Sequence, residues 1–112
     1  MENNMSRPPS IWISNRNPIK DEVVHVRTMI RHPMEAGIRH DAAGKSISRN
    51  IVNTFTCHLN DVLLFEWLPE TPVAQNPYLD FKFVARSSGV LRMRWQDDTG
   101  EIIEVTEAIT LA

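Results

Sequence analysis

Residues 78–96 read YLDFKFVARSSGVLRMRWQ, two alternating segments joined by a short polar turn. In the first segment the apolar residues Leu79, Phe81 and Phe83 alternate with polar ones such as Asp80 and Lys82. The second segment, VLRMRW, alternates apolar residues with arginines in the same way. Because successive side chains of a β-strand point to opposite faces of a sheet, each segment predicts a strand with one buried and one solvated face.

The same period of two recurs on both sides of this stretch, and no segment shows a helical period. Residues rich in Gly, Pro, Asn, Asp and Ser separate the segments, as expected for turns. One residue breaks the pattern: Glu107 falls on the apolar face of the last segment, and we expect a β-bulge to turn it outward. The further predicted strands are 11–13, 22–31, 51–60, 62–68 and 101–111.

Seven short strands predict an all-β protein, an immunoglobulin-like antiparallel β-sandwich. A small barrel is the alternative, because strand number and alternation do not distinguish closed sheets from open ones. The length of 112 residues fits one domain. We expect residues 1–9 to be a flexible N-terminal extension, residues 10–112 to form the domain, and residues 32–50 to be a long irregular loop.

Composition argues against two classes of ligand. The chain has 12 basic and 14 acidic residues and no basic cluster of the kind that binds phosphate backbones, so we expect no nucleic-acid partner. It has no apolar run of the ~18 residues that a membrane span needs, so we expect no membrane insertion. It also has no recognisable secretory signal, so the sequence by itself suggests the cytoplasm.

Cys57 is the one cysteine and the obvious candidate nucleophile, with His58 beside it as a possible base. Neighbouring residues of a strand point to opposite faces, so His58 cannot easily reach the thiol. Cys57 shares its face with Phe55 and Leu59, which predicts a buried and unreactive side chain. A small enzyme that uses Cys57 remains the alternative.

The long loop carries four potential metal ligands, namely His32, Glu35, His40 and Asp41. Their spacing matches no compact zinc or calcium motif, so we interpret them as solvated loop residues. The sequence also has no glycine-rich phosphate loop and no nucleophile elbow. We therefore expect neither a metal site nor a cofactor.

Aromatic and apolar residues indicate where a protein partner binds. Tryptophan and tyrosine are enriched at the energetic centres of interfaces. Trp95 lies on the apolar face of its strand and is expected in the core, whereas segment 62–68 is apolar on both faces and needs a cover. The candidate partner-binding residues are Trp67 as the main anchor, with Leu64, Tyr78, Val62 and Trp12.

Four short segments carry a family resemblance: HPMEAG at 32–37, FTC at 55–57, NPYL at 76–79 and DD at 97–98. Together and in this order they resemble the SoxZ family over nearly the whole chain. The resemblance implies an immunoglobulin-like sandwich that binds and stabilises SoxY in a heterodimer. SoxY carries sulfur intermediates of thiosulfate oxidation on a C-terminal cysteine arm, so this chain is expected to be the non-catalytic subunit, in transient contact with other Sox enzymes.

The resemblance also implies a compartment. Members of the family work in the periplasm, to which the partner's signal peptide carries both subunits. A generic immunoglobulin-like binding module is the alternative function, since it shares the fold and the apolar strand but does not need the four segments.

Overall fold

In the computed structural model, which describes residues 8–71 and 74–112, the chain forms seven strands and, within those residues, no helix. Each predicted strand is present, with its ends shifted by a few residues at most. Residues 1–7, most of the expected flexible extension, lie outside the described residues. The strands are β1 (Ser10–Ile13), β2 (Val23–Met29), β3 (Val52–Leu59), β4 (Val62–Trp67), β5 (Tyr78–Val84), β6 (Gly89–Asp97) and β7 (Ile102–Ile109).

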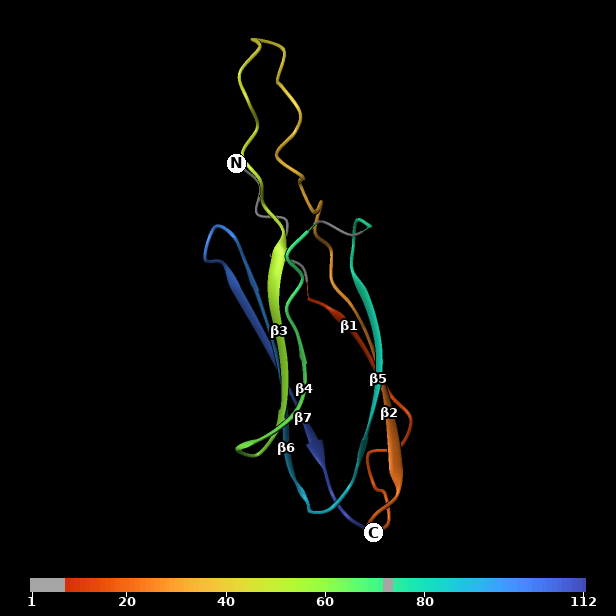
Figure 1. Cartoon of the computed structure of the whole chain (residues 1–112). Helices are drawn as coiled ribbons and strands as arrows, with labels where there is room; N and C mark the ends of the chain where they lie inside the picture. The colour runs from red at the N-terminus through yellow and green to blue at the C-terminus, as the bar shows by residue number, and fades with distance from the viewer. Residues whose placement is uncertain (1–7, 72–73) are drawn as a thin grey trace.

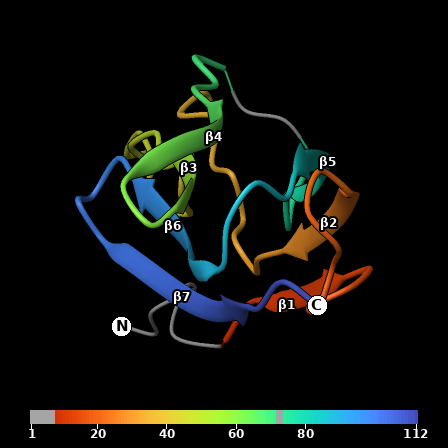
Figure 2. The same cartoon turned by 90° about the horizontal axis from the view of Figure 1, so that it is seen from below.

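The strands form two antiparallel sheets that face each other (Figures 1 and 2). One has three strands in the order β1-β2-β5, and the other has four in the order β4-β3-β6-β7. The connection at residues 85–88 therefore carries the chain from one sheet to the other. Two separate sheets confirm the predicted sandwich rather than the barrel.

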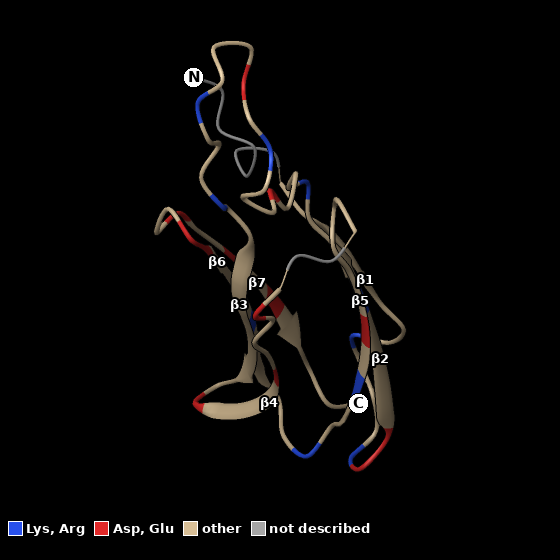
Figure 3. Cartoon of the chain, turned by 45° about the horizontal axis from the view of Figure 1, so that its top comes forward, with Lys and Arg blue, Asp and Glu red and all other residues tan. Residues whose placement is uncertain are grey.

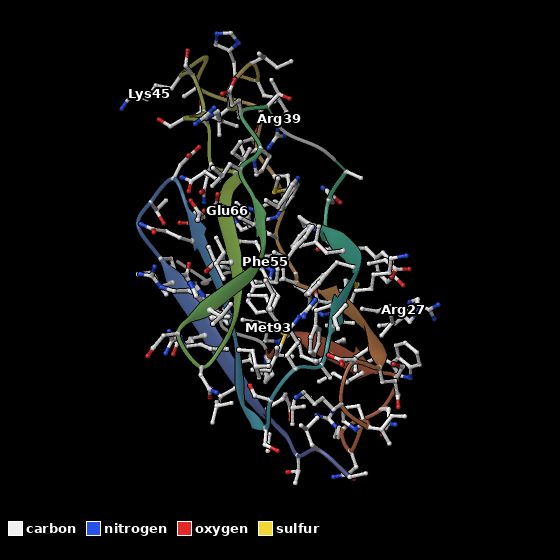
Figure 4. The ribbon with its side chains drawn as sticks, turned by 60° about the horizontal axis from the view of Figure 1, so that its bottom comes forward. Arg27, Arg39, Lys45, Phe55, Glu66 and Met93 are labelled. Atoms are coloured by element: carbon white, nitrogen blue, oxygen red, sulfur yellow. The ribbon has the colours of Figure 1, made fainter. Side chains whose placement is uncertain are left out.

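The core is the layer of side chains between the two sheets. Phe55 of β3 lies at its centre, with ring centroids 4.9 Å from Trp95 and 5.8 Å from Phe81 of the opposite sheet. Cys57 and Met93 are fully buried beside it, and Figure 4 shows Phe55 and Met93 pointing into this layer. The alternation in the sequence therefore assigned the buried faces correctly, including Trp95.

One side of the sandwich is closed by the C-terminal residues. Thr110 N–H donates to the carbonyl of Arg16 at 2.9 Å, and Ala112 N–H donates to that of Pro18 at 2.8 Å. The bulge expected near Glu107 is absent, because β6 and β7 pair in continuous register. Glu107 keeps its place at the edge of the inner face, where an ion pair of 2.8 Å with Arg16 compensates its charge.

The other side of the sandwich, between edge strands β4 and β5, is open. No backbone hydrogen bond found among the described residues joins the two strands. The rings of Phe65 and Phe81 stack across the gap instead, with centroids 4.6 Å apart and planes 4° from parallel. Leu64 is an extra residue in β4, because Cys57 pairs with Phe65 while His58 pairs with Leu63, and this bulge twists the edge.

Residues 35–50 form a two-legged arm that projects from one end of the sandwich (Figure 1). Bridges between Glu35 and Asn50 and between His40 and Ser46 hold the legs together. At the tip, Asp41 accepts backbone hydrogen bonds from Ala43 and Lys45. The arm gives the chain its length, 59 Å against 23 and 21 Å in the other directions.

Candidate functional site

A groove lies where β4 ends and β5 begins, on the open side of the sandwich. Its walls are Trp67 and residues 74–79, and its volume is about 420 Å³. Trp67 is half-buried and packs against the core, whereas Tyr78 is 59% exposed. An exposed tyrosine beside a partly buried tryptophan is typical of the aromatic centre of a protein interface.

A second, smaller hollow of about 250 Å³ adjoins the groove on the outer face of the three-stranded sheet. Trp12, Arg27, Met29 and Tyr78 contribute to its walls, so Tyr78 belongs to both hollows. The Arg27 guanidinium lies over the Trp12 ring, 4.7 Å from its centroid. This cation–π contact holds the exposed indole in place.

The structure thus brings together three of the five predicted partner-binding residues, Trp12, Trp67 and Tyr78. The other two lie apart from the hollows. Val62 is 63% exposed at the far end of β4, next to the turn that follows β3. Leu64 is half-buried at the bulge and packs against the core.

The end of the groove rests on a buried histidine. His32 N–H donates to Asn76 Oδ1 at 3.0 Å, and Asn76 N–H donates to the His32 carbonyl at 2.8 Å. These two bonds hold Asn76 in the left-handed region, at φ 52°, which asparagine tolerates better than most residues. The start of β5, which carries Tyr78, is therefore held in one position.

The His32 side chain is buried, so the interpretation of His32 as a solvated loop residue was wrong. Met34 N–H donates to Nδ1 at 3.0 Å, which places the ring proton on Nε2, where Asp97 Oδ2 accepts it at 3.2 Å. Both ring nitrogens thus have a hydrogen-bond partner, and the burial of the imidazole costs little free energy. Asp97 Oδ1 in turn accepts from the backbone of Thr99 and Glu101.

Asp98, the next residue, ties the arm to the sandwich. Its carboxylate accepts hydrogen bonds from Arg49 at 2.8 and 3.0 Å and from Asn53 at 3.0 Å. Burial raises the pKa of Asp98, but the bonds from Asn53 and Arg49 outweigh burial and leave the pKa below its ordinary value. Figure 3 shows this acidic turn after β6.

Three of the four segments that carry the family resemblance therefore meet at one end of the fold, through His32, Asn76 and the Asp97–Asp98 pair. The fourth, 55–57, lies in the core strand β3. A family model described as sulphur oxidation protein SoxZ matches residues 13–107. The chain belongs to the SoxZ family. This match confirms the resemblance drawn from the four segments.

Solved structures support the fold of this SoxZ-family chain. Three structures of the superoxide reductase (neelaredoxin) of Ignicoccus hospitalis, two of them single-substitution variants, align with TM-scores of 0.64 to 0.69. Sequence identity is 16–18%, and the alignments cover 93–96% of this chain and 79–82% of the reductases. At this identity the likeness shows a shared fold alone. A search of curated proteins gives no match.

The single thiol of this SoxZ-family chain is sealed in the core. Cys57 has no exposed surface and lies between Met93 of β6 and Phe65 of β4 in the sheet. Burial raises its pKa to about 12. His58 takes the opposite face of β3, as predicted from the alternation. A protonated and inaccessible thiol cannot act as a nucleophile at neutral pH.

The remaining candidate ligands in the arm are dispersed. Glu35 pairs with Arg39, and His40 and Asp41 are exposed near the tip. In residues 8–71 and 74–112, no three side chains of His, Cys, Asp or Glu come close enough together to hold a metal ion. Nor does this part of the chain contain a helix long and apolar enough to cross a membrane.

We expect Cys57 to be inert toward Ellman's reagent in the native protein and to react fully in guanidinium, because its thiol is buried and protonated. The positive control is the double variant Cys57→Ala/Ser48→Cys, which moves the thiol to an exposed position in the arm. A native Cys57 that reacts as fast as the thiol of this control would show that the core opens readily around β3.

Low pH should lower the free energy of unfolding, in part because Asp98 becomes protonated. Because its pKa is lower in the folded chain than in the unfolded one, its contribution to stability is complete above the unfolded value and is lost as the pH falls through the folded value. We expect the free energy of unfolding, measured by urea titration between about pH 5 and pH 2, to fall less steeply in Asp98→Asn than in the wild type.

The matched control for this titration is Asp61→Asn, in the exposed turn after β3. It should follow the wild-type slope. An Asp98→Asn slope equal to that of the wild type would contradict the assigned role.

Proposed function

We propose that this chain is the non-catalytic subunit of a sulfur carrier complex, in which it binds and stabilises SoxY. SoxY would carry the sulfur intermediates of thiosulfate oxidation on its C-terminal cysteine arm. The observation that carries the proposal is the groove at the open side of the sandwich, where Trp67 and Tyr78 form an aromatic surface on a SoxZ-family domain.

The burial of Cys57 supports a non-catalytic role for this chain beside a partner that carries the sulfur. A sulfur carrier must form a covalent bond through a thiolate that the pathway enzymes can reach. Cys57 meets neither condition, since it is fully buried and its pKa is raised to about 12. The covalent chemistry is therefore assigned to the partner's cysteine and the binding to this chain.

The open side suits a stable protein partner better than a small ligand. The groove and the adjoining hollow share Tyr78 and extend from Trp67 of one sheet to Trp12 of the other. Further exposed apolar residues, Val62, Leu63 and Leu68, lie along or just beyond β4. An interface centred on Trp67 and Tyr78 would cover both hollows and leave a polar rim.

The proposal includes the compartment and the wider contacts. We place the complex in the periplasm, with this chain carried across the membrane by a partner that bears the signal peptide. Transient contacts with other Sox enzymes would then occur on surfaces that SoxY leaves free, which include the projecting arm in this assignment.

We expect Tyr78→Ala and Trp67→Ala each to weaken binding to purified SoxY by about tenfold or more, because truncation of a central aromatic residue costs ~2 kcal/mol. Isothermal titration calorimetry measures the affinity. The control is Val90→Ala, which truncates an apolar residue, 49% exposed, on the outer face of the four-stranded sheet and should bind as the wild type does.

Trp67 also packs against the core, so its variant should be examined by thermal unfolding as well. Tyr78 is exposed, and Tyr78→Ala should fold normally. If the Tyr78→Ala and Trp67→Ala proteins fold and bind SoxY with unchanged affinity, the groove is not the interface. If the wild type does not bind SoxY at all, the proposed function is wrong.

A further inference from the structure

We propose that β5 pairs antiparallel with β5 of a second copy of the chain, centred on Phe81, and joins the two three-stranded sheets into one. This inference concerns the isolated subunit and does not rest on the proposed function. On the open side of the sandwich, a hollow of about 520 Å³ that is open to solvent lies beside β5, lined by Phe65, Phe81, Asp80, Lys82 and His25.

The outer edge of β5 offers backbone groups for pairing. β5 is the last strand of its sheet, and its register with β2 is continuous from end to end. Just beyond its two ends, the Pro77 carbonyl accepts from Ile30 and Ala85 N–H donates to Glu22, so both odd-numbered residues turn toward β2. In an antiparallel ladder the direction alternates, and the even-numbered residues 78–84 therefore direct their N–H and C=O groups outward.

This alternation restricts how two copies can pair. Outward-directed residues must face each other, so an even-numbered residue of one copy lies opposite an even-numbered residue of the other. A register centred on Phe81 places Asp80 opposite Lys82 of the second copy, twice, and uses all seven residues of the strand. Shifting it by two residues in either direction places Asp80 opposite Asp80 or Lys82 opposite Lys82.

Charge therefore selects the centred register. Opposite charges directly across two strands stabilise a sheet, whereas like charges destabilise it. Asp80 and Lys82 are both exposed on the outer face of β5, and Figure 3 shows acidic and basic positions on this strand. Within one copy Asp80 already lies 3.5 Å from Arg27, so pairing would place it between two cations.

The apolar residues fit the same register. On the inner face, Leu79 would lie opposite Phe83 of the second copy, and the two Phe81 residues would lie opposite each other. On the outer face, the exposed Tyr78 would pair with Val84. The core layer would thus continue across the open side and cover the Phe65–Phe81 stack.

The other edge strands are less suited to self-pairing. β7 carries two glutamates, Glu104 and Glu107, and no basic residue, so no register of this strand against itself brings opposite charges together. β4 carries the bulge at Leu64, a feature that disfavours edge-to-edge pairing. β1 has four residues, too few for a ladder of comparable length.

Charge exchange at β5 tests the proposal by sedimentation of the isolated full chain. We expect the wild type to dimerise, and Asp80→Lys and Lys82→Asp each to raise the dimer Kd by about tenfold or more, since each single variant places like charges opposite each other twice. An equimolar mixture of the two variants should dimerise again, because the two lysines in β5 of one variant then face the two aspartates in β5 of the other.

The charge-matched controls are Asp61→Lys and Lys20→Asp, both exposed and outside β5, which should dimerise as the wild type does. Circular dichroism confirms that each variant is folded. The proposal is overturned if the wild type stays monomeric at the highest attainable concentration, if either single variant dimerises like the wild type, or if the mixture stays monomeric.

Discussion

Two sheets of unequal width, three strands against four, must cover each other's apolar faces. The C-terminal residues close the sandwich on the β1–β7 side, where Glu107 and Arg16 form an ion pair. On the β4–β5 side the covering is incomplete, and the stacked rings of Phe65 and Phe81 span the gap. The groove between Trp67 and Tyr78 lies on this open side, and the hollow that contains Trp12 adjoins it on the outer face of the three-stranded sheet.

The loops at one end of the sandwich give this open side a defined shape. Asn76 is held by the backbone of His32, and His32 is held by Asp97 and Met34. The network connects the start of β5, the base of the arm and the turn after β6. The side chains of His32 and Asp97 are buried and hydrogen-bonded, and such groups specify one arrangement, because an alternative would leave a buried donor or acceptor without a partner. A groove built on them needs little reorganisation before it binds.

The sequence predicted those features that depend on neighbouring residues. Alternation located all seven strands and placed Trp95, Phe55 and Cys57 in the core, because the period of a strand is local. It did not predict the burial of His32, whose partners Asn76 and Asp97 are 44 and 65 residues away. The bulge expected near Glu107 was wrong for the same reason, since Arg16, 91 residues distant, compensates the carboxylate.

The candidate site was predicted in part. Trp12, Trp67 and Tyr78 were chosen for their residue type. They line two adjoining hollows, and this arrangement could not be predicted without the strand topology. Val62 and Leu64 were chosen because β4 is apolar on both faces, but an edge strand with a bulge places them away from the groove. The pairing proposed for β5 uses a local pattern, Asp80 and Lys82 on either side of Phe81, but it also requires β5 to be an edge strand, which no local pattern reveals.

The central claim is that the open side of the sandwich is the surface that binds SoxY. Amide hydrogen exchange of the chain, free and in complex with purified SoxY, tests it most directly. We expect protection on binding to concentrate in residues 62–68 and in the groove segment 74–77. Protection confined to the outer face of β6 and β7, with exchange in 62–68 and 74–77 unchanged, would contradict the claim.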